Sequence, residues 1–323
     1  MKIADYKAEF LAHLEAKVQV AEPKNLYQPV QYILDLGGKR LRPILVLMGV
    51  SVFEKDYKKG LDAALAVEVF HNFTLLHDDI MDAAPVRRGK ATVHEKWDTN
   101  TAILSGDAMM IMANQLLESY EGASFKKLMQ LFSKTAIEVC EGQQYDMDFE
   151  TRSDVTIPEY IEMIRLKTSV LVAAALQMGA IIADASESDA QKIYDFGLNL
   201  GLAFQLQDDY LDAFGDPKTF GKQVGGDIIE NKKTYLYLQA LGKGSTAQKE
   251  RLTRLFSGTV LDTESKVEAV KTIFRETGSD RATKEEIARY TEKAFKVLDS
   301  LAIAEKSRSV LRLFGEQLMT RSV

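Results

Sequence analysis

The sequence is poor in cysteine, histidine and proline. Its 323 residues include one cysteine, Cys140, four histidines and six prolines. A single cysteine cannot close an intramolecular disulfide, and it excludes zinc or iron–sulfur centres that need several thiolates. Scarce proline leaves long uninterrupted stretches, whereas a sheet protein of this size needs many turns, which favour proline and glycine. The composition therefore disfavours both an all-β fold and a thiolate metal centre.

The sequence also lacks a basic excess and a long apolar run. Acidic residues outnumber basic ones 47 to 41, whereas a nonspecific nucleic-acid binder needs surplus positive charge. The most apolar stretch, residues 169–183, is shorter than the roughly 20 residues of a membrane span. Residues 1–10 contain no apolar run of signal-peptide length. We therefore expect a cytoplasmic protein with no transmembrane segment and no nucleic-acid partner.

What the sequence does contain is helical periodicity. In residues 61–82 apolar side chains recur at intervals of three and four, at Leu65, Val69, Phe73, Leu76 and Ile80. Similar patterns occupy residues 101–120, 125–140, 190–214 and 283–318. Another helix is expected to begin near Pro158, with Thr156 or Ser153 as its cap. Without repeats or composition breaks, the pattern predicts an all-α fold, a single domain over residues 1–323 with roughly ten or more helices in one bundle.

One acidic pattern, Asp-Asp-x-x-Asp, occurs twice, each time at the end of a long apolar helix. The two copies comprise Asp78, Asp79 and Asp82 in FTLLHDDIMD, and Asp208, Asp209 and Asp212 in FQLQDDYLD. The first and last aspartates of each copy share one helix face. Helix C-termini already carry partial negative charge, so this clustering opposes folding unless a cation binds. Oxygen ligands favour Mg²⁺ or Mn²⁺ over zinc. Solvated acidic helix ends are the alternative, but the apolar surroundings favour a metal site.

Basic residues cluster near the acidic motifs. GGKRLRP contains Lys39, Arg40 and Arg42, APVRRGK contains Arg87 and Arg88, and the polar segment after the second motif contains Lys222 and Lys232. Arginine binds phosphate bidentately, and a flexible basic loop is suited to closing over a phosphate. Each cluster alone is compatible with exposed loop charge. Beside a metal-binding helix, together they indicate a diphosphate held by Mg²⁺ and guanidinium groups.

The motifs, taken in order, resemble those of the trans-isoprenyl diphosphate synthases. They are GGKRLRP, LLHDDIMD, RRGK, GQQYD, LKT, FQLQDDYLD and GKQVGGDIIENKKT, between Tyr32 and Tyr237. The resemblance implies an all-α bundle around a deep central cavity, in a homodimer. It also implies head-to-tail (1′-4) condensation of isopentenyl diphosphate with an allylic diphosphate (dimethylallyl, geranyl or farnesyl), with three Mg²⁺ per active site.

The resemblance assigns roles residue by residue. It makes Asp78, Asp82 and Asp208 the Mg²⁺ ligands, supported by Asp79, Asp209 and Asp212. The residues that correspond to the allylic diphosphate site are Arg87, Lys167, Thr168, Gln205, Lys222 and Lys232. Those that correspond to the isopentenyl diphosphate site are Lys39, Arg42, His71 and Arg88. The catalytic residues of this set are Asp78, Asp79, Asp82, Arg87, Lys167, Asp208, Asp209 and Lys222. The resemblance assigns Arg40 no direct contact with a substrate, and His77 is expected to be a packing residue.

Product length is expected to depend on the helix that carries the first motif. Phe73 and Thr74 precede Asp78 by five and four residues, which places them about 6–7.5 Å below it along the helix. Phe73 is either the floor of the product cavity or an ordinary core residue. In the family this pattern resembles that of geranylgeranyl (C20) producers, and farnesyl diphosphate (C15) is the alternative product.

Three other functions compete with this interpretation. A di-metal oxidase needs Glu-x-x-His twice, whereas Glu68 and His71 form one copy. A class I terpene cyclase also uses an aspartate-rich helix but would lack the second Asp-Asp-x-x-Asp copy and the basic turn. A non-catalytic regulatory subunit would have lost motif residues, and none is missing here. Condensation is therefore the favoured reaction.

Overall fold

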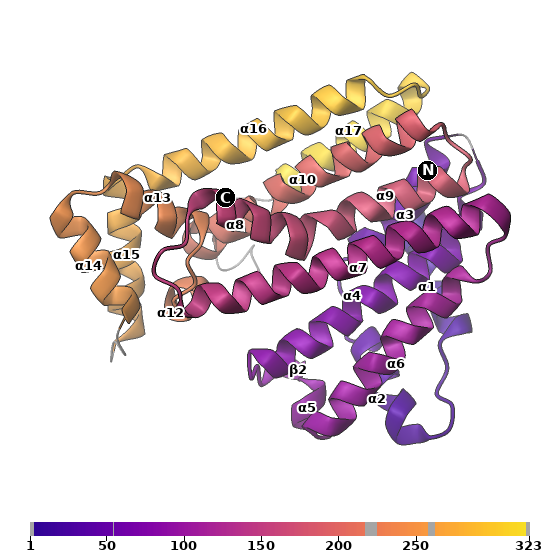
Figure 1. Cartoon of the computed structure of the whole chain (residues 1–323), viewed down its shortest axis with the longest axis horizontal. Helices are drawn as coiled ribbons and strands as arrows, with labels where there is room; N and C mark the ends of the chain where they lie inside the picture. Colours follow the sequence, from indigo (N-terminus) through magenta and orange to yellow (C-terminus); the bar gives the residue numbers. More distant parts are fainter. Residues whose placement is uncertain (1–2, 54, 217–224, 258–261, 321–323) are drawn as a thin grey trace. The chain divides into compact units, whose positions relative to one another are not determined.

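The computed structural model describes residues 3–53, 55–216, 225–257 and 262–320, and this part of the chain is almost entirely helical (Figure 1). Strand structure within it is limited to the antiparallel hairpin of β1 (Val86–Arg87) and β2 (Lys90–Ala91). The predicted all-α fold is confirmed.

The chain divides into two compact units. Unit 1 comprises Met1–Lys134 and Ala174–Ile193, and unit 2 comprises Thr135–Ala173 and Tyr194–Val323. The boundary falls inside three continuous helices, which are α7 (Gly122–Thr151), α9 (Val170–Ile182) and α10 (Glu187–Phe214). A single domain over residues 1–323 stays a prediction.

Unit 1 is built around α4 (Leu61–Met81), which packs against α3 (Leu41–Ser51) and α6 (Thr99–Leu117). Residues 63–70 of α4 are all buried, so this half of the helix is enclosed on every side. The other elements of this unit are α1 (Ile3–Lys17), α2 (Lys24–Asp35), the 3₁₀ helix η1 (Tyr57–Gly60) and α5 (Val93–Lys96). The enclosed α4 forms a rigid support for the first aspartate motif at its C-terminal end.

Unit 2 contains α8 (Ile157–Ile164), the π-helix η2 (Arg165–Ser169) and the C-terminal helices. The latter are α12 (Gly226–Ile229), α13 (Tyr235–Lys243), α14 (Thr246–Ser257), α15 (Thr263–Glu276), α16 (Ser279–Asp299) and α17 (Glu305–Met319). Its core includes Leu206, Leu252 and Phe274, which are almost fully buried.

The start of α8 is as predicted. The Thr156 side chain accepts a hydrogen bond from the backbone N–H of Glu159, and the Glu159 carboxylate accepts one from the backbone N–H of Thr156. This capping box satisfies two backbone donors at the helix start. The periodic stretch 283–318, in contrast, is divided between α16 and α17. The carbonyl of Leu301 in the break accepts a hydrogen bond from Arg308 at 3.0 Å, so a side chain replaces the helical partner there.

The helical run from Ile157 to Ile182 is longer than the apolar stretch seen in the sequence. It is long and apolar enough to cross a membrane by length and composition, but 72% of its most apolar window is buried inside the protein. Burial of this kind is typical of a core helix in a globular protein.

Candidate active site

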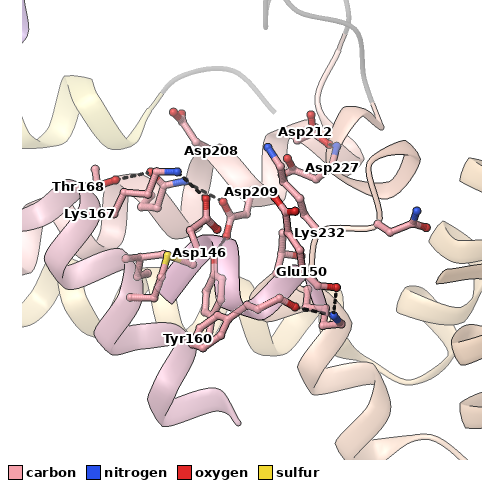
Figure 2. Close-up of a pocket in the computed structure, with 17 residues that line it drawn as sticks. Asp146, Glu150, Tyr160, Lys167, Thr168, Asp208, Asp209, Asp212, Asp227 and Lys232 are labelled. Carbon is pink, nitrogen blue, oxygen red and sulfur yellow. Dashed lines mark hydrogen bonds and ion pairs between the residues drawn. The ribbon is translucent and has the colours of Figure 1, made fainter. Parts of the chain in front are cut away.

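The second aspartate motif lines a cavity in unit 2. This cavity has a volume of about 280 Å³ and is bordered by α7, α8, the π-helix η2, α10 and the segment 227–234 (Figure 2). The residues predicted from the sequence that the structure brings together here are Lys167, Thr168, Gln205, Asp208, Asp209, Asp212 and Lys232. Residues far apart in sequence thus meet around one polar cavity. Lys222, the other lysine predicted for this site, lies outside the described residues.

Asp209 is the buried member of the motif, with 5% of its surface exposed. The Tyr160 hydroxyl donates to Oδ2 of Asp209, and Gln205 Nε2 donates to Oδ1 at 2.9 Å. Gln205 in turn accepts from the Thr168 hydroxyl at 3.1 Å. A continuous chain of hydrogen bonds therefore runs from the π-helix through α10 to α8.

The π-helix presents Lys167 and Thr168 to the cavity. Two glycines make room for it, because a side chain at Gly142 of α7 would collide with the backbone N of Lys167 and one at Gly201 of α10 would lie 2.9 Å from the Cα of Ser169. Lys167 Nζ lies 2.5 Å from Oδ2 of Asp146. Single π-turns within α-helices are frequent at functional sites, and here the wide turn carries two residues predicted to bind the allylic diphosphate.

The segment after the second motif folds back onto it. The backbone N–H of Asp227 donates to Oδ2 of Asp212 at 3.0 Å, and that of Lys232 donates to the carbonyl of Asp227 at 2.8 Å. Burial lowers the pKa of Lys232. Its ion pair with Glu230 at 2.9 Å and the charges of Asp227 and Asp146 raise the pKa by more than burial lowers it, so the net shift is upward. Lys232 is therefore a permanent cation in this cavity.

Several residues of the cavity were missed from the sequence. They are Asp146, Tyr160, Asp227, Asn231 and Lys233. Asp146 and Asp227 belong to GQQYD and GGDIIENKKT, motifs that pointed to these positions without giving them a role. Tyr160 belongs to none of the motifs. Its contact with Asp209 depends on packing between α8 and α10, which the sequence alone does not reveal.

The first aspartate motif ends α4 in unit 1. Asp79 is buried and is held by Arg87, whose Nε lies 2.9 and 2.8 Å from the two carboxylate oxygens and whose Nη2 lies 2.7 Å from Oδ1. Asp78 is half-buried, and Asp82 is exposed at the helix end. Arg87, predicted to bind diphosphate, thus forms a bidentate ion pair with the middle aspartate of this motif.

The basic turn of unit 1 has an unusual backbone. Gly37, Gly38 and Arg40 have positive φ angles of 81°, 120° and 55°. The guanidinium of Arg88 lies flat against Gly38, where a side chain would come within 2.9 Å of it, and it donates to the carbonyl of Gly37. The φ of 120° at position 38 therefore favours glycine, and a side chain there would displace the Arg88 guanidinium. Just after the turn, Arg42 in the first turn of α3 donates to Nε2 of His71 on α4 at 3.1 Å, so two predicted isopentenyl-site residues are in contact.

Arg40, which received no role from the sequence, is buried in an ion pair. It donates to Glu68 and to the carbonyl of Leu34, and Asn72 Nδ2 donates to the Glu68 carboxylate at 3.1 Å. Glu68 is therefore an ion-pair partner and is not free to ligate a metal, which argues against a di-metal oxidase. Burial and the surrounding arginines, Arg42 foremost, hold the pKa of His71 well below the ordinary imidazole value, so His71 is neutral at pH 7.

Phe73, one of the two residues predicted to limit product length, lies in an aromatic row on α4 between Phe70 and His77. The ring centroid of Phe73 lies 5.6 Å from that of Phe70 and 4.7 Å from that of His77. The Thr74 hydroxyl donates to the carbonyl of His71 at 2.8 Å. His77 packs as predicted, on the side of α6 where Gly106 leaves room for it.

The carboxylates fit Mg²⁺, although they do not form a complete ligand cage. No group of three or more Asp, Glu, His or Cys side chains is close enough to hold a metal ion in the part of the chain that the structure describes. Mg²⁺ commonly takes one or two carboxylates and completes its shell with water and substrate phosphate. Burial and the charges of Asp227 and Asp208 raise the pKa of Asp209 to about 8. The raised pKa means that burial and the neighbouring carboxylates favour the protonated form of Asp209, and a divalent cation bound here would favour the ionised carboxylate instead.

The chain matches the family model of polyprenyl synthetases over residues 23–276. It belongs to the polyprenyl synthetase family. Among its relatives in this family, a geranylgeranyl diphosphate synthase of Methanosarcina mazei is 41% identical over 250 residues, or 76% of this chain and 77% of the relative. A geranylfarnesyl diphosphate synthase of Aeropyrum pernix is 33% identical over 307 residues, or 93% of this chain and 95% of the relative.

Solved structures of polyprenyl synthetases agree with this assignment. The crystal structure of a geranylgeranyl pyrophosphate synthase matches with a TM-score of 0.96 and 55% identity, covering 100% of both chains. The chain therefore has the all-α isoprenoid synthase fold of this family, as its motifs suggested.

Proposed function

We propose that this polyprenyl synthetase condenses isopentenyl diphosphate with an allylic diphosphate (dimethylallyl, geranyl or farnesyl) to form geranylgeranyl diphosphate, a C20 product. The observation that carries the proposal is the polar cavity of unit 2, where the second aspartate motif meets Lys167, Thr168, Gln205 and Lys232. Relatives and a structural neighbour named as geranylgeranyl diphosphate synthases support the C20 product.

Asp78, Asp82 and Asp208 are the residues we propose to hold Mg²⁺, three ions per active site. When bound, Mg²⁺ neutralises the allylic diphosphate and so makes it a better leaving group. Lys167 and Lys232 add fixed positive charge in unit 2, where the leaving group becomes more negative. Asp146 lies 2.5 Å from Lys167 and orients its ammonium group.

The departing diphosphate leaves an electron-poor allylic carbon, which needs electron-rich groups and no water. The Thr168 hydroxyl donates a hydrogen bond to Oε1 of Gln205, so the lone pairs of the Thr168 oxygen are available as a dipole of the correct sign for a cation. The double bond of isopentenyl diphosphate then forms the new carbon–carbon bond, and a proton leaves to the diphosphate released in the first step. No protein nucleophile is required.

In unit 1 we propose that Lys39, Arg42 and Arg88 bind the diphosphate of isopentenyl diphosphate. His71 accepts a hydrogen bond from Arg42, which orients that guanidinium while adding no charge of its own. Arg87 is proposed to bind the allylic diphosphate, and its pairing with Asp79 holds it beside the first motif.

The reaction is tested by incubating the protein with dimethylallyl and isopentenyl diphosphates and Mg²⁺ and measuring product length. We expect a C20 product and at least a hundredfold lower turnover for Asp78→Asn, since loss of one stabilising group at the reacting charge commonly costs about 10²–10³ in rate. Asp184→Asn, at an exposed turn, is the matched control. A wild-type protein that forms no product would indicate a non-catalytic subunit instead.

Product length is tested separately through Phe73. If its ring is the floor of the product cavity, Phe73→Ala should yield products longer than C20, while Phe125→Ala, the same change at a half-buried phenylalanine of α7, should not. An unchanged product profile in Phe73→Ala would place the floor elsewhere. A C15 product from the wild type would favour the farnesyl alternative.

We further propose that the chain forms a cytoplasmic homodimer. The proposal of a dimer is supported by exposed apolar side chains on α6. Ile103, Leu104 and Ile111 are 42%, 60% and 59% exposed. Large apolar side chains gathered on one helix face are typical of a protein interface.

A further inference from the structure

Tyr160 is a buried polar residue to which the proposed reaction gives no role. It lies on α8, is 3% exposed, and its ring packs in the core of unit 2. Its hydroxyl is directed at the cavity, where it donates to Asp209 (Figure 2). Burial of a tyrosine needs only some acceptor for its hydroxyl. Here the acceptor is a carboxylate in the middle of the second aspartate motif.

The bond to Tyr160 completes the support of Asp209. Gln205 holds one carboxylate oxygen at 2.9 Å and Tyr160 holds the other. The two donors come from different helices, α10 and α8, so together they define the plane of the carboxylate. A buried carboxylate that loses one of two donors is free to rotate and has an unsatisfied oxygen, which is costly.

We propose that Tyr160 is a positioning residue, which holds Asp209 and through it keeps the second aspartate motif arranged to bind Mg²⁺ together with a diphosphate. Tyr160 does not touch the reacting atoms in this role. It acts through Asp209, which follows Asp208 directly on α10 and lies between Asp208 and the network that leads to Thr168. The inference rests on the proposed function, because it takes Mg²⁺ and a diphosphate as the ligands of this motif.

The test removes a single oxygen. Tyr160→Phe keeps the buried ring and deletes the hydroxyl, and Tyr237→Phe is the matched control. Tyr237 is a buried tyrosine of the same unit, 5% exposed, whose hydroxyl bonds to Thr253 outside the cavity. The primary measurement is calorimetric binding of inorganic pyrophosphate at a series of Mg²⁺ concentrations, which requires no turnover. We expect binding to weaken by about tenfold in Tyr160→Phe, as for loss of a hydrogen bond to a charged group, and to be unchanged in Tyr237→Phe.

A double-mutant cycle separates positioning from simple core packing. If Tyr160 acts through Asp209, Tyr160→Phe should weaken binding in the wild type but have no further effect in the Asp209→Asn background. KM for isopentenyl diphosphate should stay the same in all variants, because its proposed ligands belong to unit 1. Equal binding by Tyr160→Phe and wild type, or an undiminished effect in the Asp209→Asn background, would overturn the inference.

Failure of the proposed function is distinguishable from failure of this inference. A wild-type protein that binds Mg²⁺ and pyrophosphate but forms no prenyl product contradicts the reaction and leaves the positioning role measurable. If Tyr160→Phe does not fold, Gln205→Glu supplies the second variant. It replaces the other donor to Asp209 by an acceptor and is expected to weaken Mg²⁺-dependent pyrophosphate binding, whereas unchanged binding would contradict the role of this network.

Discussion

Arg40 is a charged residue in a position where charge is costly. It is 5% exposed, has a left-handed backbone conformation, and pairs with Glu68, which is 3% exposed. A buried ion pair gains little net stability, but removing one partner leaves the other charge buried and unpaired. The pair therefore holds the basic turn in place on α4. Lys39 and Arg42, which flank Arg40 in the sequence, are positioned with it.

Glu68→Gln should destabilise the protein strongly. We expect the free energy of unfolding in urea to fall by about 3–5 kcal/mol, because the Arg40 guanidinium stays buried without a counter-charge. Glu292→Gln on α16 breaks the exposed pair with Lys296 and should leave the free energy of unfolding almost unchanged, because solvent screens an exposed ion pair. Similar losses in the two variants would contradict the structural role of Arg40.

His71 should remain neutral through the physiological pH range. Its pKa is lowered by burial and by the charges of Arg42, Arg88, Arg87 and Arg40, from the turn and the hairpin. A histidine with a lowered folded-state pKa contributes full stability above its unfolded pKa of about 6.5 and loses it as pH falls below that value. We expect no imidazole titration of His71 in NMR spectra between pH 8 and pH 6.5. A titration midpoint near 6.5 would contradict this.

At the scale of elements, the π-helix depends on a glycine of another helix. The backbone of Lys167 occupies the space that a side chain at Gly142 would need. Gly142→Ala should therefore force α7 and the π-helix apart and lower the free energy of unfolding by about 1–3 kcal/mol, as overpacking usually does. Gly242→Ala on α13 is the control, since nothing lies within 4 Å of the added methyl group. There the change should stabilise by about 0.5–1 kcal/mol. If Gly142→Ala is as stable as Gly242→Ala, the close packing of α7 on the π-helix does not require glycine at position 142.

The elements differ in how far the sequence predicted them. The helix of residues 61–82 and the start of α8 followed from periodicity and capping residues, because both are set by neighbours along the chain. The π-helix and the break between α16 and α17 did not follow. The π-helix depends on close packing of Gly142 and Gly201, and the break coincides with a side chain, Arg308, bonding to a carbonyl of Leu301.

At the scale of the whole molecule, the α6 face should decide the oligomeric state. Leu104→Glu combined with Ile111→Glu places two charges on the proposed interface, and light scattering after gel filtration should then show half the wild-type mass. Leu313→Glu on α17, where leucine is 53% exposed, should leave the dimer intact. A wild-type protein that elutes as a monomer would contradict the homodimer.

The sequence by itself determined the helical class, the two aspartate motifs, the basic clusters and the family. These features are local, because helix periodicity, i to i+4 spacing and side-chain chemistry are carried by neighbouring residues. Only the tertiary structure decided which of these residues act on one another. Tyr160 and Asp209 are 49 positions apart and Arg40 and Glu68 are 28 apart, so their contacts exist only where buried helices pack and where a polar group removed from water must find its partner.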